Sequence, residues 1–220
     1  MKGRDPLYAI QLIHELRLYS SIFLASPTVL KSFSAPPADP LQGLIAATIL
    51  HSLTTTTSPL TAIHPLLAQH FASHPSIRPR LFLASALTPF KDVTYRNAKD
   101  KIHPGVEAVL REGCKLGNQN NYLSGIPTLF SAAKLLKNPT LERFNRHPER
   151  VTIGEPPGGA TWHASSYKLF SGLLLRDKSV HNPNVGSTWP VSLLFSLVQE
   201  LLPFWRTPDD YEGKGAPFIP

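Results

Sequence analysis

Apolar residues recur at the three- and four-residue spacing of helices along most of this 220-residue chain, and this spacing limits the fold more than any other feature. In the first such segment Leu7, Ile10 and Ile13 share one face. Asp5 can cap that helix, with Pro6 in its first turn, where a missing N–H is tolerated. No segment alternates apolar and polar residues for long enough to indicate a strand. The sequence therefore predicts an all-α fold.

The expected helices are bounded by proline, glycine or serine-rich stretches. They cover residues 6–25, 41–53, 60–73, 77–88, 104–116, 123–136, 139–146, 164–175 and 188–202. Loops are expected at residues 26–40, at the Thr/Ser/Pro tract 54–59 and at the Pro/Gly segment 154–159. Residues from Pro208 to the end show no periodicity, and we expect them to be disordered.

The composition excludes several classes of protein. The single cysteine cannot form an internal disulfide, which excludes a stapled secreted scaffold. The longest apolar run, residues 44–50, falls far short of a membrane span. The segment Lys-Gly-Arg-Asp-Pro at residues 2–6 follows Met1 in place of an apolar signal core. We therefore expect a soluble, intracellular, globular chain with no membrane partner, and cytoplasm, nucleus and mitochondrion all stay open.

Positive charge gathers in the middle of the chain. The formal net charge is +7, and residues 91–150 hold 11 basic and 6 acidic residues, a net of +5. A phosphate backbone binds such a region by releasing counterions. The alternative is a solvated helical face, since Glu107, Glu112 and Glu142 stand at pairing distances from basic residues. The sequence leaves both interpretations open.

Motifs of known catalytic and metal sites are missing. The chain has no G-x-G-x-x-G, no G-x-x-x-x-G-K-[ST], no H-E-x-x-H, no paired-cysteine zinc spacing and no G-x-S-x-G. It also has no D-x-D, the source of paired carboxylates for two-metal nucleotidyl transfer. We therefore assign no catalytic residue and no metal ligand to this chain.

A few side chains have a chemical and a structural interpretation, and the structural one is favoured for each. His64, His70 and His74 are spaced for a metal but lack a nearby carboxylate or cysteine, so capping or surface roles are expected. Cys114 could be a thiolate activated by neighbouring charge, although packing is the commoner state of a lone helical cysteine. The three tryptophans are expected in the core or at an interface: Trp162, Trp189 and Trp205.

Several segments in a fixed order carry a family resemblance. They are residues 2–6 leading into 9–13 and 18–23, then 101–104 with 106–107, 111–118, 125–127, 176–184 and 192–201. Together they resemble the body and tail of class II CCA-adding tRNA nucleotidyltransferases, and the last resembles the fungal branch of the eukaryotic enzyme. In the family's first helix, A-L-x-L-I-x-x-L-G-L-Y-x-x-I-F, Arg17 replaces the glycine. The resemblance covers nearly the whole chain.

The resemblance implies a division into a tRNA-binding helical body at 1–150 and a helical tail at 151–207, with 208–220 beyond it. The family's catalytic head and neck carry the glycine-rich turn, the metal carboxylates and the residues that select CTP and ATP, and none has a counterpart here. We therefore expect a fragment that is inactive alone and needs no cofactor itself. Mg²⁺ with CTP or ATP is expected for the full-length enzyme, and a separate chain could supply the head.

The implied partner is the acceptor and T-arm of tRNA, held by its shape and phosphates. Because the family supplies no residue-level motif for this contact, the candidates rest on charge and location: Lys91, Arg96, Lys99, Lys101, Arg111, Lys115, Arg176 and Lys178. The last two could instead stabilise a local turn through Asp177. Two other functions stay open, a non-catalytic helical RNA-binding or protein-interaction scaffold and, ranked last, a self-sufficient enzyme of an unrelated type.

Overall fold

The computed structural model describes residues 5–55, 71, 76–97, 99–117, 121–137 and 164–205. These residues are mostly helical, with one small two-stranded sheet, which confirms the predicted all-α class in its coarse form. Predicted helices at 60–73 and 139–146, the loop at 154–159 and the disordered end at 208–220 lie outside the described residues. The tract at 54–59 is described only to residue 55.

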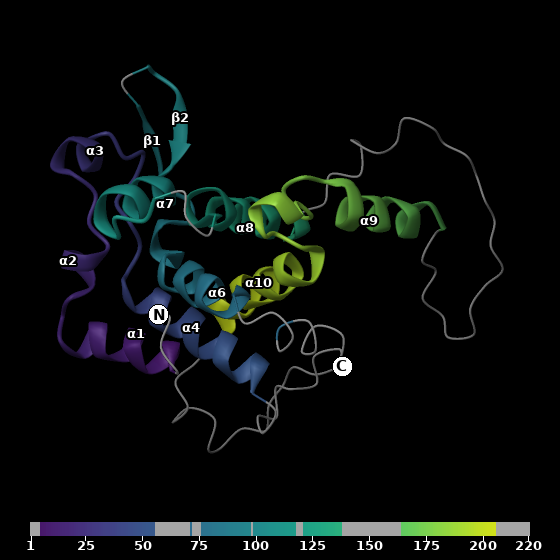
Figure 1. The fold of residues 1–220 in the computed structure, drawn as a ribbon, viewed down its shortest axis with the longest axis horizontal. Coiled ribbons are helices and arrows are strands. Elements are labelled where there is room, and N and C mark those ends of the chain that lie inside the picture. The colour runs from purple at the N-terminus through teal and green to yellow at the C-terminus, as the bar shows by residue number, and fades with distance from the viewer. Residues whose placement is uncertain are drawn as a thin grey trace.

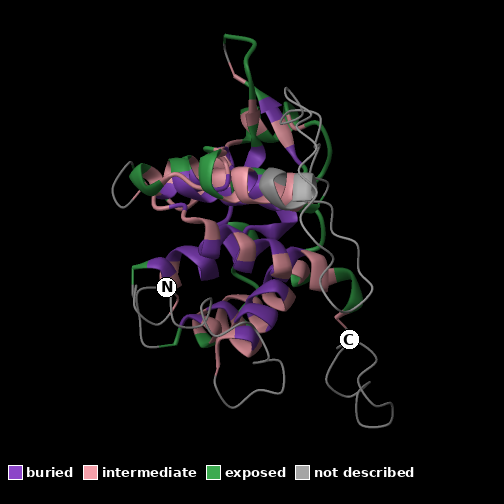
Figure 2. Cartoon of the chain, turned by 90° about the vertical axis from the view of Figure 1, so that its right-hand side faces the viewer, coloured by how far each residue is buried: buried purple, intermediate pink, exposed green. Residues whose placement is uncertain are grey.

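Four helices enclose the main apolar core (Figure 1). They are α4 (Leu41–Thr54), α6 (Ile77–Ala86), α8 (Tyr122–Lys137) and α10 (Trp189–Leu201), and α1 (Pro6–Glu15) packs on α4 and α6. Buried residues concentrate where these helices face each other (Figure 2). The largest fully buried side chains of the core include Phe82, Phe195, Ile10, Ile49, Leu50, Leu81 and Ile126. The four helices confirm the predictions at 41–53, 77–88, 123–136 and 188–202 to within two residues.

Helix α10, which falls in the predicted tail, packs into the same core as the predicted body. Phe195 meets the Phe130 ring of α8 edge to face, with 5.0 Å between centroids. Gln199 Nε2 donates to Thr88 Oγ1 at 3.1 Å, which joins α10 to the 3-10 turn η2 (Thr88–Phe90). The proposed division at residue 150 lies outside the described residues and stays a prediction.

The predicted single helix at 6–25 is wrong, because the chain breaks after α1. Arg17 has a φ of 55°, in the left-handed region that side-chain-bearing residues rarely adopt. A second short helix, α2 (Tyr19–Ile22), then starts in a new direction. The break brings the Tyr19 hydroxyl to the Ala86 carbonyl of α6, to which it donates at 2.7 Å. A buried tertiary contact therefore accompanies the interruption of the helix.

The expected loop at 26–40 contains a short helix, α3 (Pro27–Lys31). Ser26 caps it, and Pro27 stands in its first turn. The Ser26 N–H donates to Glu112 Oε2 at 2.5 Å, so a carboxylate far along the chain also stabilises the helix start. This contact joins two segments 86 residues apart, and no local pattern predicts it.

The prediction of no strands is wrong at one place. Strands β1 (Thr94–Arg96) and β2 (Ile102–Pro104) form an antiparallel hairpin, in which Tyr95 stands opposite His103. Phe33 bridges to Tyr95 along the outer edge of β1. At the base of the hairpin the Gly105 N–H donates to the Val93 carbonyl at 2.7 Å. Strands of three residues are too short to show alternation, and tertiary contacts stabilise them.

The predicted helix at 104–116 is present in two parts. α7 (Gly105–Ala108) continues into the π-helical turn η3 (Val109–Gly113), where the Cys114 N–H donates to the Val109 carbonyl at 3.0 Å. Further along, α9 (Ala164–Arg176) confirms the prediction at 164–175. The turn η6 (Pro183–Val185) precedes α10, and η7 (Leu202–Phe204) follows it.

Candidate nucleic-acid interface

All eight basic residues predicted to bind RNA are exposed. Six of them belong to one continuous part of the chain, here called the basic hairpin region: Lys91, Arg96, Lys99, Lys101, Arg111 and Lys115. Lys91 follows η2, the next three lie on the hairpin, Arg111 is in η3 and Lys115 follows it. The hairpin projects from the helices at the top of Figure 1. A projecting hairpin can present its cations to a large partner.

Asn97 organises the end of the hairpin. Its Oδ1 accepts the backbone N–H groups of Lys99 and Lys101 at 2.9 and 3.0 Å. Its own N–H donates to the Lys101 carbonyl at 3.0 Å. Nearby, Arg96 Nη1 pairs with Asp100 Oδ1 at 2.9 Å, although both side chains are largely exposed. The turn is therefore built by one asparagine, and the lysine side chains are left to solvent.

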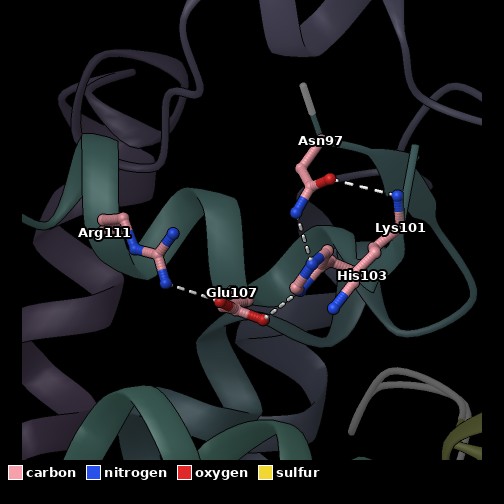
Figure 3. Close-up of polar contacts among 5 residues, drawn as sticks. All are labelled: Asn97, Lys101, His103, Glu107 and Arg111. Atoms are coloured by element: carbon pink, nitrogen blue, oxygen red, sulfur yellow. Dashed lines mark hydrogen bonds and ion pairs between the residues drawn. The ribbon is translucent and has the colours of Figure 1, made fainter. Parts of the chain in front are cut away.

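A chain of polar contacts joins the hairpin to α7 and η3 (Figure 3). Asn97 Nδ2 lies 2.9 Å from His103 Nε2, and His103 Nδ1 lies 3.1 Å from Glu107 Oε2. Arg111 Nη2 donates to Glu107 Oε1 at 2.6 Å. Glu107 is the most enclosed of the ion-paired side chains, with 18% of its side chain exposed, against 57% for Arg111. It therefore positions both the histidine and the arginine.

The base of this network is buried against aromatic rings. Tyr95 is buried, and its ring lies 5.6 Å from the His103 ring and 6.4 Å from the Phe33 ring, centroid to centroid. Burial raises the pKa of the Tyr95 hydroxyl, and the negative charge of Glu107 adds to the effect. Tyr95 therefore stays neutral and serves as the apolar support of the hairpin.

Most carboxylates of this region are already engaged. Asp100 pairs with Arg96, Glu107 with Arg111 and His103, and Glu112 accepts the Ser26 N–H. Within the described residues, Lys91, Lys99, Lys101 and Lys115 form no ion pair. These four lysines are therefore available to an anionic partner. This distribution favours phosphate binding over a face of mutually paired charges.

Arg176 and Lys178 lie elsewhere. They stand at the C-terminal end of α9 and just after it, apart from the hairpin in Figure 1. Asp177 stabilises the turn there through Oδ1, which accepts the Ser179 N–H at 2.7 Å. Its carbonyl also accepts the N–H groups of Val180 and His181. Among the described residues no ion pair joins Asp177 to either basic neighbour. Because of their position at the end of α9 (Figure 1), the two cations are not part of the basic hairpin region.

The remaining candidate residues either pack against apolar clusters or lie outside the described residues. Trp189 packs beside a small cluster of Ala132, Leu173 and Val180, and Trp205 packs on the main core. His64, His70, His74 and Trp162 lie outside the described residues. Within the described ranges no three His, Cys, Asp or Glu side chains gather as a metal site. In the same ranges no helix has both the length and the apolar character to cross a membrane.

Cys114 gives a test of the choice between a packed and an activated thiol. Burial raises its pKa to about 11, so the neutral thiol predominates near pH 7. We expect iodoacetamide to alkylate the native protein about 100-fold more slowly than an ordinary thiol at the same pH. The rate should rise as the pH approaches 11, and urea should restore the ordinary rate. Alkylation of the folded chain at the rate of free cysteine would contradict the packed state.

Sequence reasoning missed the residues that arrange these cations. The i,i+4 pair of Glu107 and Arg111 is visible in the sequence and was expected. The roles of Asn97 and His103 depend on the hairpin, which the sequence did not predict. Asparagine between two segments containing a β-branched or aromatic residue is the one local signal that could have indicated the turn.

Comparison with known proteins gives no assignment. No family model matches this chain, and neither a curated protein nor a solved structure is significantly similar to it.

Proposed function

We propose that the chain binds the acceptor and T-arm of tRNA as the body and tail of a CCA-adding tRNA nucleotidyltransferase. The observation that carries the proposal is a set of four exposed lysines around a projecting hairpin that form no ion pair with any described residue. Duplex RNA offers phosphates and 2′-hydroxyl groups across a shallow minor groove, and such a partner is bound by shape and charge. The basic hairpin region is suited to that kind of contact.

One backbone angle supports the resemblance to this family. Arg17 stands where the family's pattern has glycine, and its φ of 55° is one that glycine adopts without strain. The residue with a left-handed backbone therefore stands at the position of the family's glycine. This agreement comes from the backbone and is independent of the charge argument.

The chemistry of CCA addition is not assigned to this chain. Mg²⁺ and CTP or ATP would belong to a catalytic head in the same or a separate chain. We expect the 220-residue chain alone to incorporate no CTP or ATP.

Binding to a tRNA acceptor-arm minihelix tests the proposal directly. Affinity should fall steeply with rising salt, because each neutralised phosphate releases counterions. Replacing Lys99 and Lys101 together with alanine should weaken binding about tenfold and reduce the magnitude of the salt slope by about 2. The matched control removes two lysines from α8, Lys134 and Lys137, and should change affinity little. Fluorescence anisotropy between about 50 and 200 mM salt measures both quantities.

Two outcomes would overturn this proposal. One is absence of minihelix binding at about 50 mM salt, and the other is binding that does not respond to salt. The alternative function, a helical scaffold with a solvated basic face, predicts a different result. Replacing Lys99, Lys101, Arg111 and Lys115 with alanine would then leave partner binding unchanged. Nucleotide incorporation by the purified chain would instead indicate a self-sufficient enzyme.

A further inference from the structure

The hairpin loop that presents Lys99 and Lys101 depends on the orientation of one amide. Both backbone N–H groups point at Asn97 Oδ1, at 2.9 and 3.0 Å. If the amide were reversed, its NH₂ group would face the N–H groups of Lys99 and Lys101, and donors would face donors. The amide is therefore fixed in the described orientation. Its Nδ2 therefore faces His103.

The contacts of His103 determine where its proton lies. Asn97 Nδ2 can only donate, so His103 Nε2 at 2.9 Å must be unprotonated and accept. The Glu107 carboxylate can only accept, so His103 Nδ1 at 3.1 Å must carry the proton. The described arrangement thus requires a neutral imidazole with its hydrogen on Nδ1. With 28% of its side chain exposed, His103 can exchange protons with solvent.

We infer that His103 in this neutral form is the positioning residue of the basic hairpin region, and that its protonation releases the backbone of Lys99 and Lys101 from Asn97. A second proton would set an N–H group of the ring against the NH₂ group of Asn97. Glu107 would still accept a hydrogen bond from Nδ1 of the imidazolium. Protonation would therefore break the contact between His103 Nε2 and Asn97 Nδ2. The effect of His103 protonation on the order of the loop does not depend on the proposed function. Its effect on RNA affinity rests on the proposed function.

The groups around His103 come from three elements. Tyr95 on β1 lies against the ring, and Glu107 on α7 accepts from it. Arg111 on η3 shares the Glu107 carboxylate at 2.6 Å and compensates part of its charge. On the hairpin itself, Arg96 and Lys101 flank the site with their side chains exposed to solvent. Protonation therefore adds a cation to a cluster in which, among the described residues, Glu107 is the one anion in contact with the ring.

Amide hydrogen exchange in the full chain tests the loop release. From about pH 8 to about pH 5, across the ordinary titration range of histidine, protection of the Lys99 and Lys101 amides should fall. After correction for intrinsic rates, the expected loss is about three- to tenfold relative to the amides of α8. The glutamine of His103→Gln can accept from Asn97 and donate to Glu107 but does not titrate. In this variant the protection of the Lys99 and Lys101 amides should therefore stay constant over the same pH range. Unchanged protection in the original chain, or the same loss in His103→Gln, would overturn the inference.

Asn97→Asp provides a test of opposite sign. The new carboxylate can still accept both lysine amides, and it can also accept a proton from Nε2 of the imidazolium. Protection of the two amides should then be greater at about pH 5 than at about pH 8. If this variant lost protection on acidification as the original chain does, the assigned hydrogen-bond directions would be wrong.

The effect on RNA is measured at one pH, about pH 8, above the ordinary titration range of histidine. His103→Leu should bind the minihelix about fivefold more weakly, because the loop must be ordered on binding. His103→Gln should match the original chain. Equal affinity for all three would refute the positioning role in RNA binding. If no variant binds RNA while the amides still respond to pH, the proposed function fails and the loop inference stands.

Discussion

Replacing Gly43 with alanine is expected to destabilise the protein by about 2–3 kcal/mol. Gly43 is buried in the first turn of α4, where that helix crosses α6. A Cβ atom there would lie 2.5 Å from the carbonyl oxygen of Ala86 and 3.1 Å from its carbonyl carbon. These atoms are backbone, so the overlap is relieved only if the two helices separate. Urea unfolding followed by circular dichroism gives the change in free energy of unfolding.

A second helical glycine serves as the matched control. Gly172 lies in α9, and no atom of the described residues lies within 4 Å of the place where its Cβ would stand. Gly172→Ala should therefore stabilise the protein by about 0.5–1 kcal/mol, through reduced freedom of the unfolded chain and better helix propensity. Opposite signs at the two glycines would establish the close helix contact. A Gly43→Ala variant as stable as the original would show that α4 and α6 do not approach so closely.

Arg80→Met is the second substitution with a large expected effect, a loss of about 3 kcal/mol. Arg80 is buried in α6, and its Nη1 donates to the Gly186 carbonyl at 2.7 Å and to the Val185 carbonyl at 3.3 Å. Burial lowers the pKa of the guanidinium below its ordinary value, but arginine stays charged in proteins. Methionine retains the apolar stem and removes the Nη1 group that donates both hydrogen bonds. Thermal and urea unfolding measure the loss.

The control for this prediction stands on the same helix. Arg78 is half-buried, and its guanidinium lies over the Phe82 ring at 5.9 Å from the centroid. Arg78→Met should change the free energy of unfolding by less than about 1 kcal/mol. Similar losses for both variants would show that the contact of Arg80 with the turn before α10 contributes no more than the half-buried cation–π pair of Arg78.

Local patterns predicted the long helices well. The apolar stripe of Val191, Leu194, Phe195, Val198 and Leu201 predicts α10; the first four side chains are buried and Leu201 is half-buried. The segment that forms α4 contains no Asp, Glu, Lys or Arg, which is typical of a core helix, and six of its residues are buried. Such elements are predictable because the burial that stabilises them is set by their own residues.

The features that depend on distant residues were not predictable. Arg17 gives no local stop signal of the kind a glycine would, and the helix break accompanies the contact of Tyr19 with α6. The hairpin likewise depends on Phe33, some 60 residues away from Tyr95 along the chain. In the candidate site, charge and exposure were visible in the sequence. The Asn97–His103–Glu107 network was not, because its first contact exists only once the hairpin has formed.

The place of α10 in the sequence has a consequence for the order of folding during synthesis. α10 contacts α8 and α4, and Val191, Leu194, Phe195 and Val198 belong to the main core. A nascent chain that has emerged only as far as α8 therefore exposes apolar surface that nothing yet covers. On the ribosome the core can close only after residue 201 has left the exit tunnel. An mRNA truncated before the codon for residue 189 should yield a chain without α10, whose exposed apolar surface chaperones and proteases recognise.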